Sequence, residues 1–211
     1  SMRLFACLLV LLVCGCSTQV RPELRQAVDE KLAAQRSTEI DCDANREPGC
    51  SISSPLLHLG QVDSRNNTHH ATLVDIGEDA LKARLHLIRA AKNSIEFQNF
   101  LYRRDQTGGL VIDELLRSAK RGVKVRIIFD QLFTVTDVEF LASLAVEHSN
   151  FEVRLYNPLF NMAKTNRYRM FGGVACCFTR SNQRMHNKLL VVDGVIGMTG
   201  GRNIADRYFD F

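Results

Sequence analysis

The sequence predicts an α/β domain in which helices cover a β-sheet. Two observations favour this class. From about residue 71 onward, helical and extended hydrophobic patterns alternate along the chain, and the extended runs have the length of buried strands. With 211 residues, 45% of them hydrophobic and 24% charged, the chain has an ordinary globular composition and enough apolar side chains for one sizeable core. We therefore expect one such domain, preceded by an N-terminal leader.

The first helix of this domain is predicted to begin near Asp75. Leu81, Leu85 and Ile88 recur at helical spacing and would share one face. Asp75 can accept a hydrogen bond from the first turn, and Glu78 stands three residues later, where the acid of a capping box belongs. We expect an amphipathic helix that starts at this cap.

A strand, a helix and a second strand follow in order. Residues 94–102 place Ile95, Phe97, Asn99 and Leu101 at every second position, which is the period of a strand. Residues 108–121 repeat at helical spacing, and Gly122 stands where a helix commonly ends in a left-handed residue. Residues 123–129, Val-Lys-Val-Arg-Ile-Ile-Phe, are rich in β-branched and aromatic side chains and predict a buried strand that ends at Asp130.

The pattern then repeats once more. Thr136 and Glu139 form a capping box before a helix that is predicted to reach His148. Residues 151–156 alternate again and predict the next strand. The sequence of strand, helix, strand, helix, strand is typical of a sheet covered by helices.

A hairpin near the end of the chain carries the most informative side chains. Residues 188–192 and 195–199 predict two strands, joined through Asp193-Gly194, a favoured hairpin turn. Strand side chains repeat every second residue, so His186 and Lys188 would project from the same face if this segment is extended. An imidazole and an ammonium group would then stand side by side.

This pair suits chemistry at a phosphate. An imidazole can attack phosphorus or carry a proton, and an ammonium group can neutralise the charge on the phosphate oxygens. Gly200 and Gly201 allow backbone to approach a phosphate closely, and Asn203 offers an amide donor. Taken singly, His186 and Lys188 would be interpreted as ordinary polar surface residues without a functional role. Their spacing to Asp193 and to the glycine-glycine-x-asparagine element favours a site instead.

At these residues the chain resembles the phospholipase D superfamily. His186, Lys188 and Asp193 match its H-x-K-(x)4-D signature, and Gly200-Gly201-Arg202-Asn203 matches the element that follows it. The amino-acid sequences of residues 184–188 and 201–209 are similar to those of cardiolipin synthases in particular. Residues 119–130 resemble the helix-to-strand passage of the same fold. The resemblance covers roughly residues 74–211.

The resemblance implies a phospholipase D-like lobe, a mixed β-sheet flanked by helices on both faces. It also implies a two-step mechanism without metal or other cofactor, through a phosphohistidine. His186 would be the nucleophile or the acid/base, with the nucleophile preferred for a first motif. Lys188, Asn203 and Gly201 would hold the phosphate, and Asp193 would support the motif by hydrogen bonding.

The chain departs from the family in having one such motif where two are usual. None of its other histidines is followed by Lys and Asp at the required spacing. The sequence stops at Phe211, eight residues after Asn203, so we expect a lobe that is incomplete at its C-terminus: the N-terminal half, or a truncated form, of a longer enzyme. A second motif would come from homodimerisation or from a missing C-terminal half.

The N-terminus predicts export. Residues 1–16 have a basic start, a short apolar run and a small-residue end, as secretory signal peptides do. The end resembles a bacterial lipoprotein signal in which Cys16 would be lipidated; the alternative is cleavage elsewhere, which would leave a soluble periplasmic protein. We interpret residues 17–70 as a tether and residues 71–211 as the catalytic domain, exported and periplasmic or membrane-anchored.

Four cysteines remain once the predicted leader is removed. Cys42 and Cys50 can close a small loop in an oxidising compartment, because the intervening Pro48-Gly49 supplies a turn. Cys176 and Cys177 lack the spacing of a zinc site, so we predict no metal and expect buried or idle thiols there.

The function predicted is transfer of a phosphatidyl group between phospholipids, as in cardiolipin synthesis, at a membrane. The substrate would be an anionic phospholipid similar to phosphatidylglycerol. The alternatives are a metal-independent phosphodiesterase that cleaves nucleic acid and an inactive half-enzyme. The net charge of +4 and the isoelectric point of about 8.7 are modest for a nucleic-acid binder, which makes nucleic acid the less favoured partner.

Overall fold

The structure is a computed structural model of the chain. It describes residues 26, 30, 33, 40–42, 50–131, 138–158, 168, 171–172, 176–179 and 182–210. The predicted leader, residues 1–16 with Cys16, lies outside the described residues. Within the described part, no helix combines the length and the apolar character needed to cross a bilayer.

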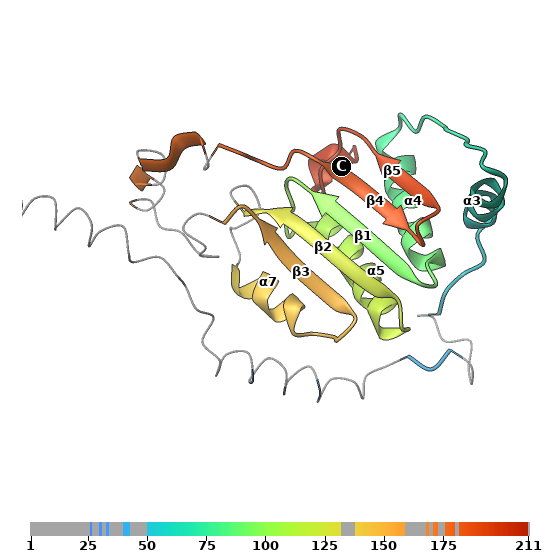
Figure 1. Cartoon of the computed structure of the whole chain (residues 1–211), viewed down its shortest axis with the longest axis horizontal. Helices are drawn as coiled ribbons and strands as arrows, with labels where there is room; N and C mark the ends of the chain where they lie inside the picture. The colour runs from blue at the N-terminus through green and yellow to red at the C-terminus, as the bar shows by residue number, and fades with distance from the viewer. Residues whose placement is uncertain are drawn as a thin grey trace, which may run out of the picture.

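Five strands form one mixed sheet, in the spatial order β3-β2-β1-β4-β5 (Figure 1). The two crossover connections give parallel pairs, β1 with β2 and β2 with β3, whereas β4 pairs antiparallel with β1 and with β5. The parallel strands therefore end, and β4 begins, at one edge, called here the C-terminal edge. The strands are β1 Ser94–Asn99, β2 Lys124–Asp130, β3 Phe151–Tyr156, β4 Lys188–Val192 and β5 Ile196–Thr199.

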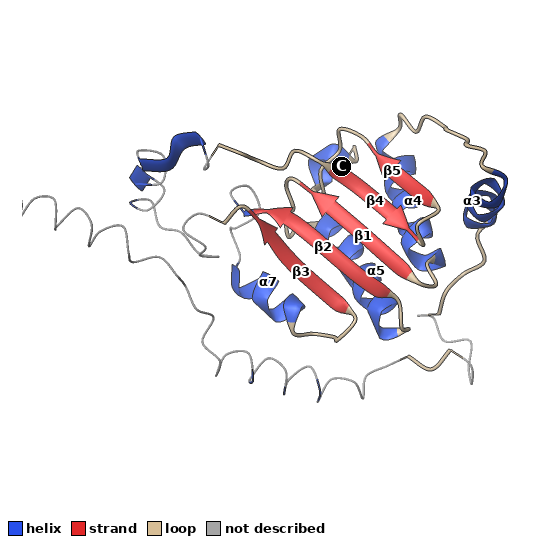
Figure 2. Cartoon of the chain, viewed as in Figure 1, coloured by secondary structure: helices blue, strands red, loops and turns tan. Residues whose placement is uncertain are grey.

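The helices gather on one face of this sheet. Both α4 and α5 lie behind the strands in Figure 2, and the ring of Phe140 in α7 stacks on Tyr102, which contacts Phe129 of β2 on the same face. The predicted α/β class and mixed sheet are confirmed, but the described helices cover one face rather than both. The helices are α3 Pro55–Asn66, α4 Gly77–Ala90, α5 Gln106–Lys120 and α7 Val138–Ala145.

The strand sequences explain this one-sided layering. Along β1 and β2 every second side chain is buried, including Ile95, Phe97 and Phe129, which form the core with the apolar sides of the helices. The alternate positions carry charged residues that pair across or along strands, such as Arg126 with Glu96. The second face therefore has the polar alternation of a sheet side that no described helix covers.

The start of α4 differs from the prediction. The helix begins at Gly77, its N-cap is Ile76, and no side chain caps it from that position. The carboxylate of Asp210, distant in sequence, accepts the Gly77 N–H at 2.8 Å, so the cap predicted at Asp75 is wrong. Glu78 pairs instead with Lys82 one turn later, at 2.8 Å. A tertiary contact has replaced the local one.

Around α5, local sequence signals agree better with the structure than they do at the start of α4. Asp105 caps the helix by accepting the Gly108 N–H at 3.0 Å, and Gly122 follows its end with φ +96°. That left-handed conformation is the one predicted for the residue and costs glycine little. The capping box at Thr136 lies outside the described residues, although α7 itself follows it at Val138.

Part of the predicted tether packs on the domain. Ser54 caps α3 through its hydroxyl, and the buried side chain of Leu57 joins the core cluster. Gly60 lies so close to β5 that an added Cβ would stand 2.8 Å from the Ile196 side chain. The helix α3 thus lies against the sheet edge, within the range interpreted as a tether.

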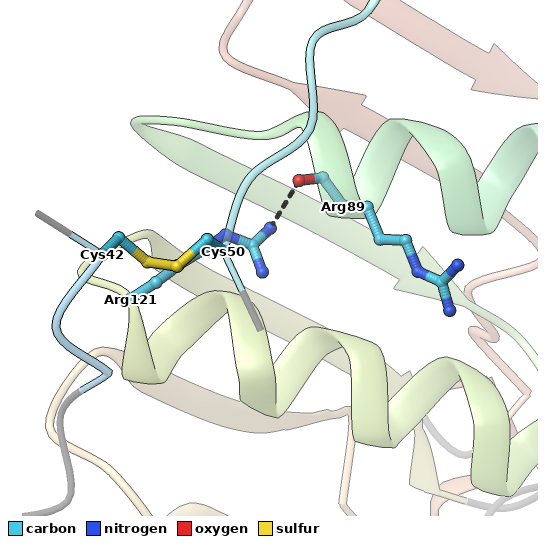
Figure 3. The surroundings of a disulfide bond; sticks show 4 residues. All are labelled: Cys42, Cys50, Arg89 and Arg121. Atoms are coloured by element: carbon cyan, nitrogen blue, oxygen red, sulfur yellow. Dashed lines mark hydrogen bonds between the residues drawn. A yellow bond between two sulfur atoms is a disulfide. The ribbon is translucent and has the colours of Figure 1, made fainter. Parts of the chain in front are cut away.

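Described residues before α3 also contact the domain, at the C-terminal ends of α4 and α5. Figure 3 shows the sulfur atoms of Cys42 and Cys50 bonded to each other, the pairing that the sequence favoured, with a Cα–Cα distance of 5.6 Å. Beside it the Arg121 guanidinium donates to the carbonyl of Arg89. Backbone bonds from Ile40 to the Lys120 carbonyl and from Ile52 to the Arg89 carbonyl hold the segment there.

We predict that Phe129→Ala lowers the free energy of unfolding by about 3–5 kcal/mol, because Phe129 is fully buried and truncation leaves a cavity. Urea unfolding followed by circular dichroism would measure the loss. Leu73→Ala is the control: its side chain is 87% exposed, and it should change stability by less than about 0.5 kcal/mol. Equal losses in the two variants would contradict the proposed core.

Candidate functional site

His186 and Lys188 meet at the C-terminal edge of the sheet. Lys188 is the first residue of β4 and lies opposite Asn99, the last residue of β1. Its Nζ donates to the carbonyl of His186 at 2.9 Å and stands 5.0 Å from the centre of the Phe100 ring. The His186 ring meets the same Phe100 ring edge-on, with centroids 4.7 Å apart. Both motif side chains therefore contact the Phe100 ring, and the Lys188 ammonium group bonds to the backbone of His186.

Burial changes the acidity of Lys188. The residue is 7% exposed, and this burial lowers the pKa of its ammonium group, while the nearby Tyr208 opposes the shift. A partly desolvated cation attracts an anion more strongly than a hydrated one, because less water screens it. Lys188 is thus suited to hold a phosphate at this edge.

Asn203 lies next to the same group. Its side-chain oxygen accepts the Leu101 N–H at 3.2 Å, which fixes the orientation of the amide. Hydrogen bonding with Asn203 is the main cause of a lowered Tyr208 pKa, to which the charge of Lys188 also contributes. Asn203, Tyr208 and Lys188 therefore form one polar cluster at the edge of the sheet.

The two glycines before Asn203 leave space beside it. Gly201 is exposed, and a Cβ added at Gly200 or at Gly201 would meet no described atom within 4 Å. Neither glycine has a positive φ, so backbone strain does not explain them. The open space agrees with room for a ligand near the backbone, which is the role that the sequence suggested for Gly201.

Asn99 belongs to the same side of the sheet. The register places Asn99 directly opposite Lys188, so Asn99 and not its neighbour Gln98 shares a face with the lysine. Asn99 is 1% exposed, and its Oδ1 has no hydrogen-bond partner among the described residues. Gln98 projects from the other face, where its Oε1 accepts from Asn187 at 3.1 Å.

Asp193, the third residue of the signature, lies at the opposite end of β4. Its carboxylate accepts the backbone N–H groups of Lys92, Asn93 and Ser94 at 2.8–3.2 Å. These bonds hold the start of β1 beside the hairpin turn, where Asp193 itself has φ +51°. The structure thus separates Asp193 from the His186–Lys188 pair and gives it an anchoring position.

Phe100 and Tyr208 are site residues that sequence reasoning missed. Phe100 follows β1 and contacts both motif side chains, while Tyr208 lies in a 3-10 turn, Asp206–Tyr208, after Asn203. Tyr208 lies within residues 201–209, whose sequence resembles that of cardiolipin synthases, so the sequence contained a signal for it. No periodic pattern marked Phe100.

The described residues contain no cluster of three or more His, Cys, Asp or Glu side chains placed to hold a metal ion. Cys176 and Cys177 are exposed and bonded to each other, which differs from the buried or idle thiols expected there. The chemistry of this edge is that of a histidine, a lysine, an asparagine amide and a phenol.

We predict that Asp193→Ala lowers the free energy of unfolding by about 1–3 kcal/mol, because three backbone N–H groups lose their acceptor, among them the partly buried N–H of Ser94. Denaturant titration would measure the change. Asp113→Ala is the matched control, since Asp113 makes only an exposed pair with Arg117 and its loss should cost less than about 1 kcal/mol. An Asp193 variant as stable as the control would rule out the anchoring role.

We predict that Lys188 loses its proton at a lower pH than the ordinary lysine value of 10.5. An ammonium group is charged below its pKa, so a lowered pKa removes the charge earlier as pH rises, and anion binding weakens with it. The pH dependence of acetylation at Lys188, followed by peptide mass spectrometry, measures the midpoint. A midpoint at or above 10.5 would contradict the effect of burial.

Comparison with known proteins connects this geometry to a family. The family model described as cardiolipin synthase, PLD-like domain, matches residues 85–211. An uncharacterised protein of Helicobacter pylori (strain ATCC 700392 / 26695) is 39% identical over 160 residues, covering 75% of this chain and 31% of that protein. Cardiolipin synthase C of Escherichia coli (strain K12) is 39% identical over 132 residues, covering 62% and 26%. Cardiolipin synthase 1 of Bacillus anthracis is 32% identical over 164 residues, covering 74% and 29%.

This chain thus spans between 26% and 31% of the length of these relatives. Among solved structures, NucT from Helicobacter pylori aligns with a TM-score of 0.46 at 20% identity, covering 63% of this chain and 72% of that one. Nuc from Salmonella typhimurium, a phospholipase D family member, aligns with a TM-score of 0.40 at 20% identity, covering 60% and 66%. Because the family model matches more than half of the sequence, the chain belongs to the cardiolipin synthase PLD-like domain family, within the phospholipase D superfamily.

Proposed function

We propose that the protein transfers a phosphatidyl group from one anionic phospholipid to another, as in cardiolipin synthesis, through a phosphohistidine at His186. The observation that carries this proposal is the placement of His186 beside Lys188 at the C-terminal edge of the sheet, next to the Asn203–Tyr208 pair. Membership in the cardiolipin synthase family supports a phospholipid as the substrate.

The first step makes a bond between a ring nitrogen of His186 and phosphorus. The bond from phosphorus to the headgroup glycerol oxygen of a phosphatidylglycerol-like donor breaks. The departing glycerol oxygen takes a proton from a second histidine. In the second step, a hydroxyl of another phospholipid attacks phosphorus, gives its proton to that second histidine and releases His186. The chain has one H-x-K-(x)4-D motif, so a second copy or another part of a longer protein would supply the second histidine.

The neighbours of His186 fit these steps. Charge on the phosphate oxygens grows as each bond forms, and Lys188 with the Asn203 amide can stabilise that charge. The Phe100 ring packs against both motif side chains and keeps water from that side of them. A preorganised cation in partly dry surroundings stabilises the transition state more than a mobile surface lysine would.

The test is turnover of phosphatidylglycerol vesicles in the presence of EDTA, with single-stranded DNA as a parallel substrate. We expect wild-type protein to form cardiolipin, and His186→Asn and Lys188→Ala to lose activity by about a hundredfold or more. His58→Asn is the control, because His58 is exposed on α3 and remote from the motif in sequence. It should retain wild-type turnover.

Each other result identifies a different function. Metal-independent cleavage of DNA without cardiolipin formation would favour the phosphodiesterase alternative. Inactivity on both substrates, in a protein that remains folded by circular dichroism, would favour an inactive half-enzyme. Retained activity in His186→Asn would exclude the phosphohistidine step.

A further inference from the structure

His186, the proposed nucleophile, lies just outside the sheet. Residues 183–187, here called the lead-in segment, have no regular secondary structure, and β4 begins only at Lys188. The strand ladder therefore does not fix the backbone of His186. A nucleophile must be held within about 0.5 Å of its productive position, so other contacts have to orient this segment.

A buried carboxylate supplies two of these contacts. Asp130 ends β2 at the C-terminal edge, and its side chain is 0% exposed. One oxygen accepts the backbone N–H of Met185 at 3.0 Å, and the other accepts from Nη1 of Arg184 at 3.2 Å. The residue directly before His186 is thus bonded to a rigid strand end.

The Arg184 side chain extends the same arrangement to β3. Its Nη2 donates to the carbonyl of Asn157 at 3.0 Å, and the Asn157 amide donates in return to the carbonyl of Gln183 at 2.8 Å. Asn157 follows β3 with φ +44°, a conformation that asparagine tolerates better than most residues. Gln183, Arg184 and Met185 are therefore all fixed from the ends of β2 and β3.

The far side of the lead-in segment is tied to β1. Asn187 donates to Gln98 of β1 at 3.1 Å, and His186 itself packs on Phe100. The lead-in residues on both sides of His186 thus have hydrogen-bond partners at the C-terminal edge. The imidazole projects from a segment that is held on both sides.

The buried Asp130–Arg184 pair contributes little net stability to the fold. Burying two charges costs desolvation energy that their attraction only balances when the geometry is good, and apolar side chains of similar size often serve stability as well. An arginine whose two Nη groups bond to a carboxylate and to a carbonyl does give direction, because its donors are planar and fixed. The pair is better suited to orienting the chain than to stabilising it.

We infer that Asp130 and Arg184 are positioning residues, which aim His186 by holding the lead-in segment at the C-terminal edge. The inference rests on the proposed function, in which His186 attacks phosphorus. Neither residue needs to contact the substrate. A misplacement of about 1 Å at a reacting group can cost about a hundredfold in rate, so loss of the hold should lower kcat and leave KM nearly unchanged.

The test compares Asp130→Asn and Arg184→Lys with Asp113→Asn, which makes the same chemical change in an exposed Asp–Arg pair of α5. Asp130→Asn keeps an oxygen for the Met185 N–H but loses the charge that faces Arg184. Arg184→Lys keeps the charge but loses the fork that joins Asp130 to Asn157. If one variant fails to fold, the other still tests the inference.

Two readouts are taken on the same protein. The first is kcat and KM for phosphatidylglycerol: we expect kcat to fall by about a hundredfold in both variants, and Asp113→Asn to match wild type. The second is the NMR signal of the His186 ring, which the adjacent Phe100 ring shifts. In Asp130→Asn and Arg184→Lys that signal should move toward its position in Phe100→Leu, which serves as the reference without the ring.

The two readouts separate the failure of this inference from the failure of the proposed function. An unmoved His186 signal in both variants would overturn the positioning role, whether kcat falls or not. If wild-type protein does not turn over phosphatidylglycerol, the proposed function fails, and the displaced His186 signal would still support the positioning of that ring. A displaced signal with unchanged kcat in an active enzyme would also overturn the inference.

Discussion

The antiparallel register between β4 and β1 is the constraint on which the site depends. It places Lys188 opposite Asn99 and Leu190 opposite Phe97, so one strand face serves both the site and the core. A slip of one residue would turn Lys188 to the other face, because strand side chains alternate. The carboxylate of Asp193 resists such a slip by binding the backbone of residues 92–94 at the far end of the pair. The signature aspartate thus sets the geometry of its lysine from a distance.

Much of the fold could be predicted from sequence, because its strands and α5 follow local rules. The alternation in β1 and the glycine after α5 depend on near neighbours in the chain, and both predictions agree with the structure. The cap of α4 could not be predicted, because Asp210 reaches Gly77 across the fold. The helix α3 was also missed, since its apolar contacts with α4 and β5 decide its position and no strong periodicity marks them.

The candidate site divides in a similar way. His186, Lys188 and Asn203 were found because the motif has a fixed spacing, and the structure places these three at one edge. Phe100 and Asp130 could not be found from the motif spacing, because each lies at the end of a strand that is remote in sequence from the motif. Asp130 had the sequence context of an ordinary strand-end residue. Only the sheet order, which brings three strand ends beside the lead-in segment, reveals its contacts.

Within the strands, the buried polar residues lie apart from the buried apolar ones. Buried Asn99, Asp130, Lys188 and Asn203 lie at or next to the C-terminal edge, whereas the middle of the sheet is filled by apolar side chains such as Ile127. Buried polar groups cost free energy unless they are hydrogen-bonded. Asp130, Lys188 and Asn203 have such partners. The buried Oδ1 of Asn99 has none among the described residues, so this oxygen is a local loss of stability at the edge. The apolar centre of the sheet offsets that loss and keeps the strands rigid. A rigid sheet, in turn, is what allows a histidine outside any strand to be aimed by contacts from strand ends.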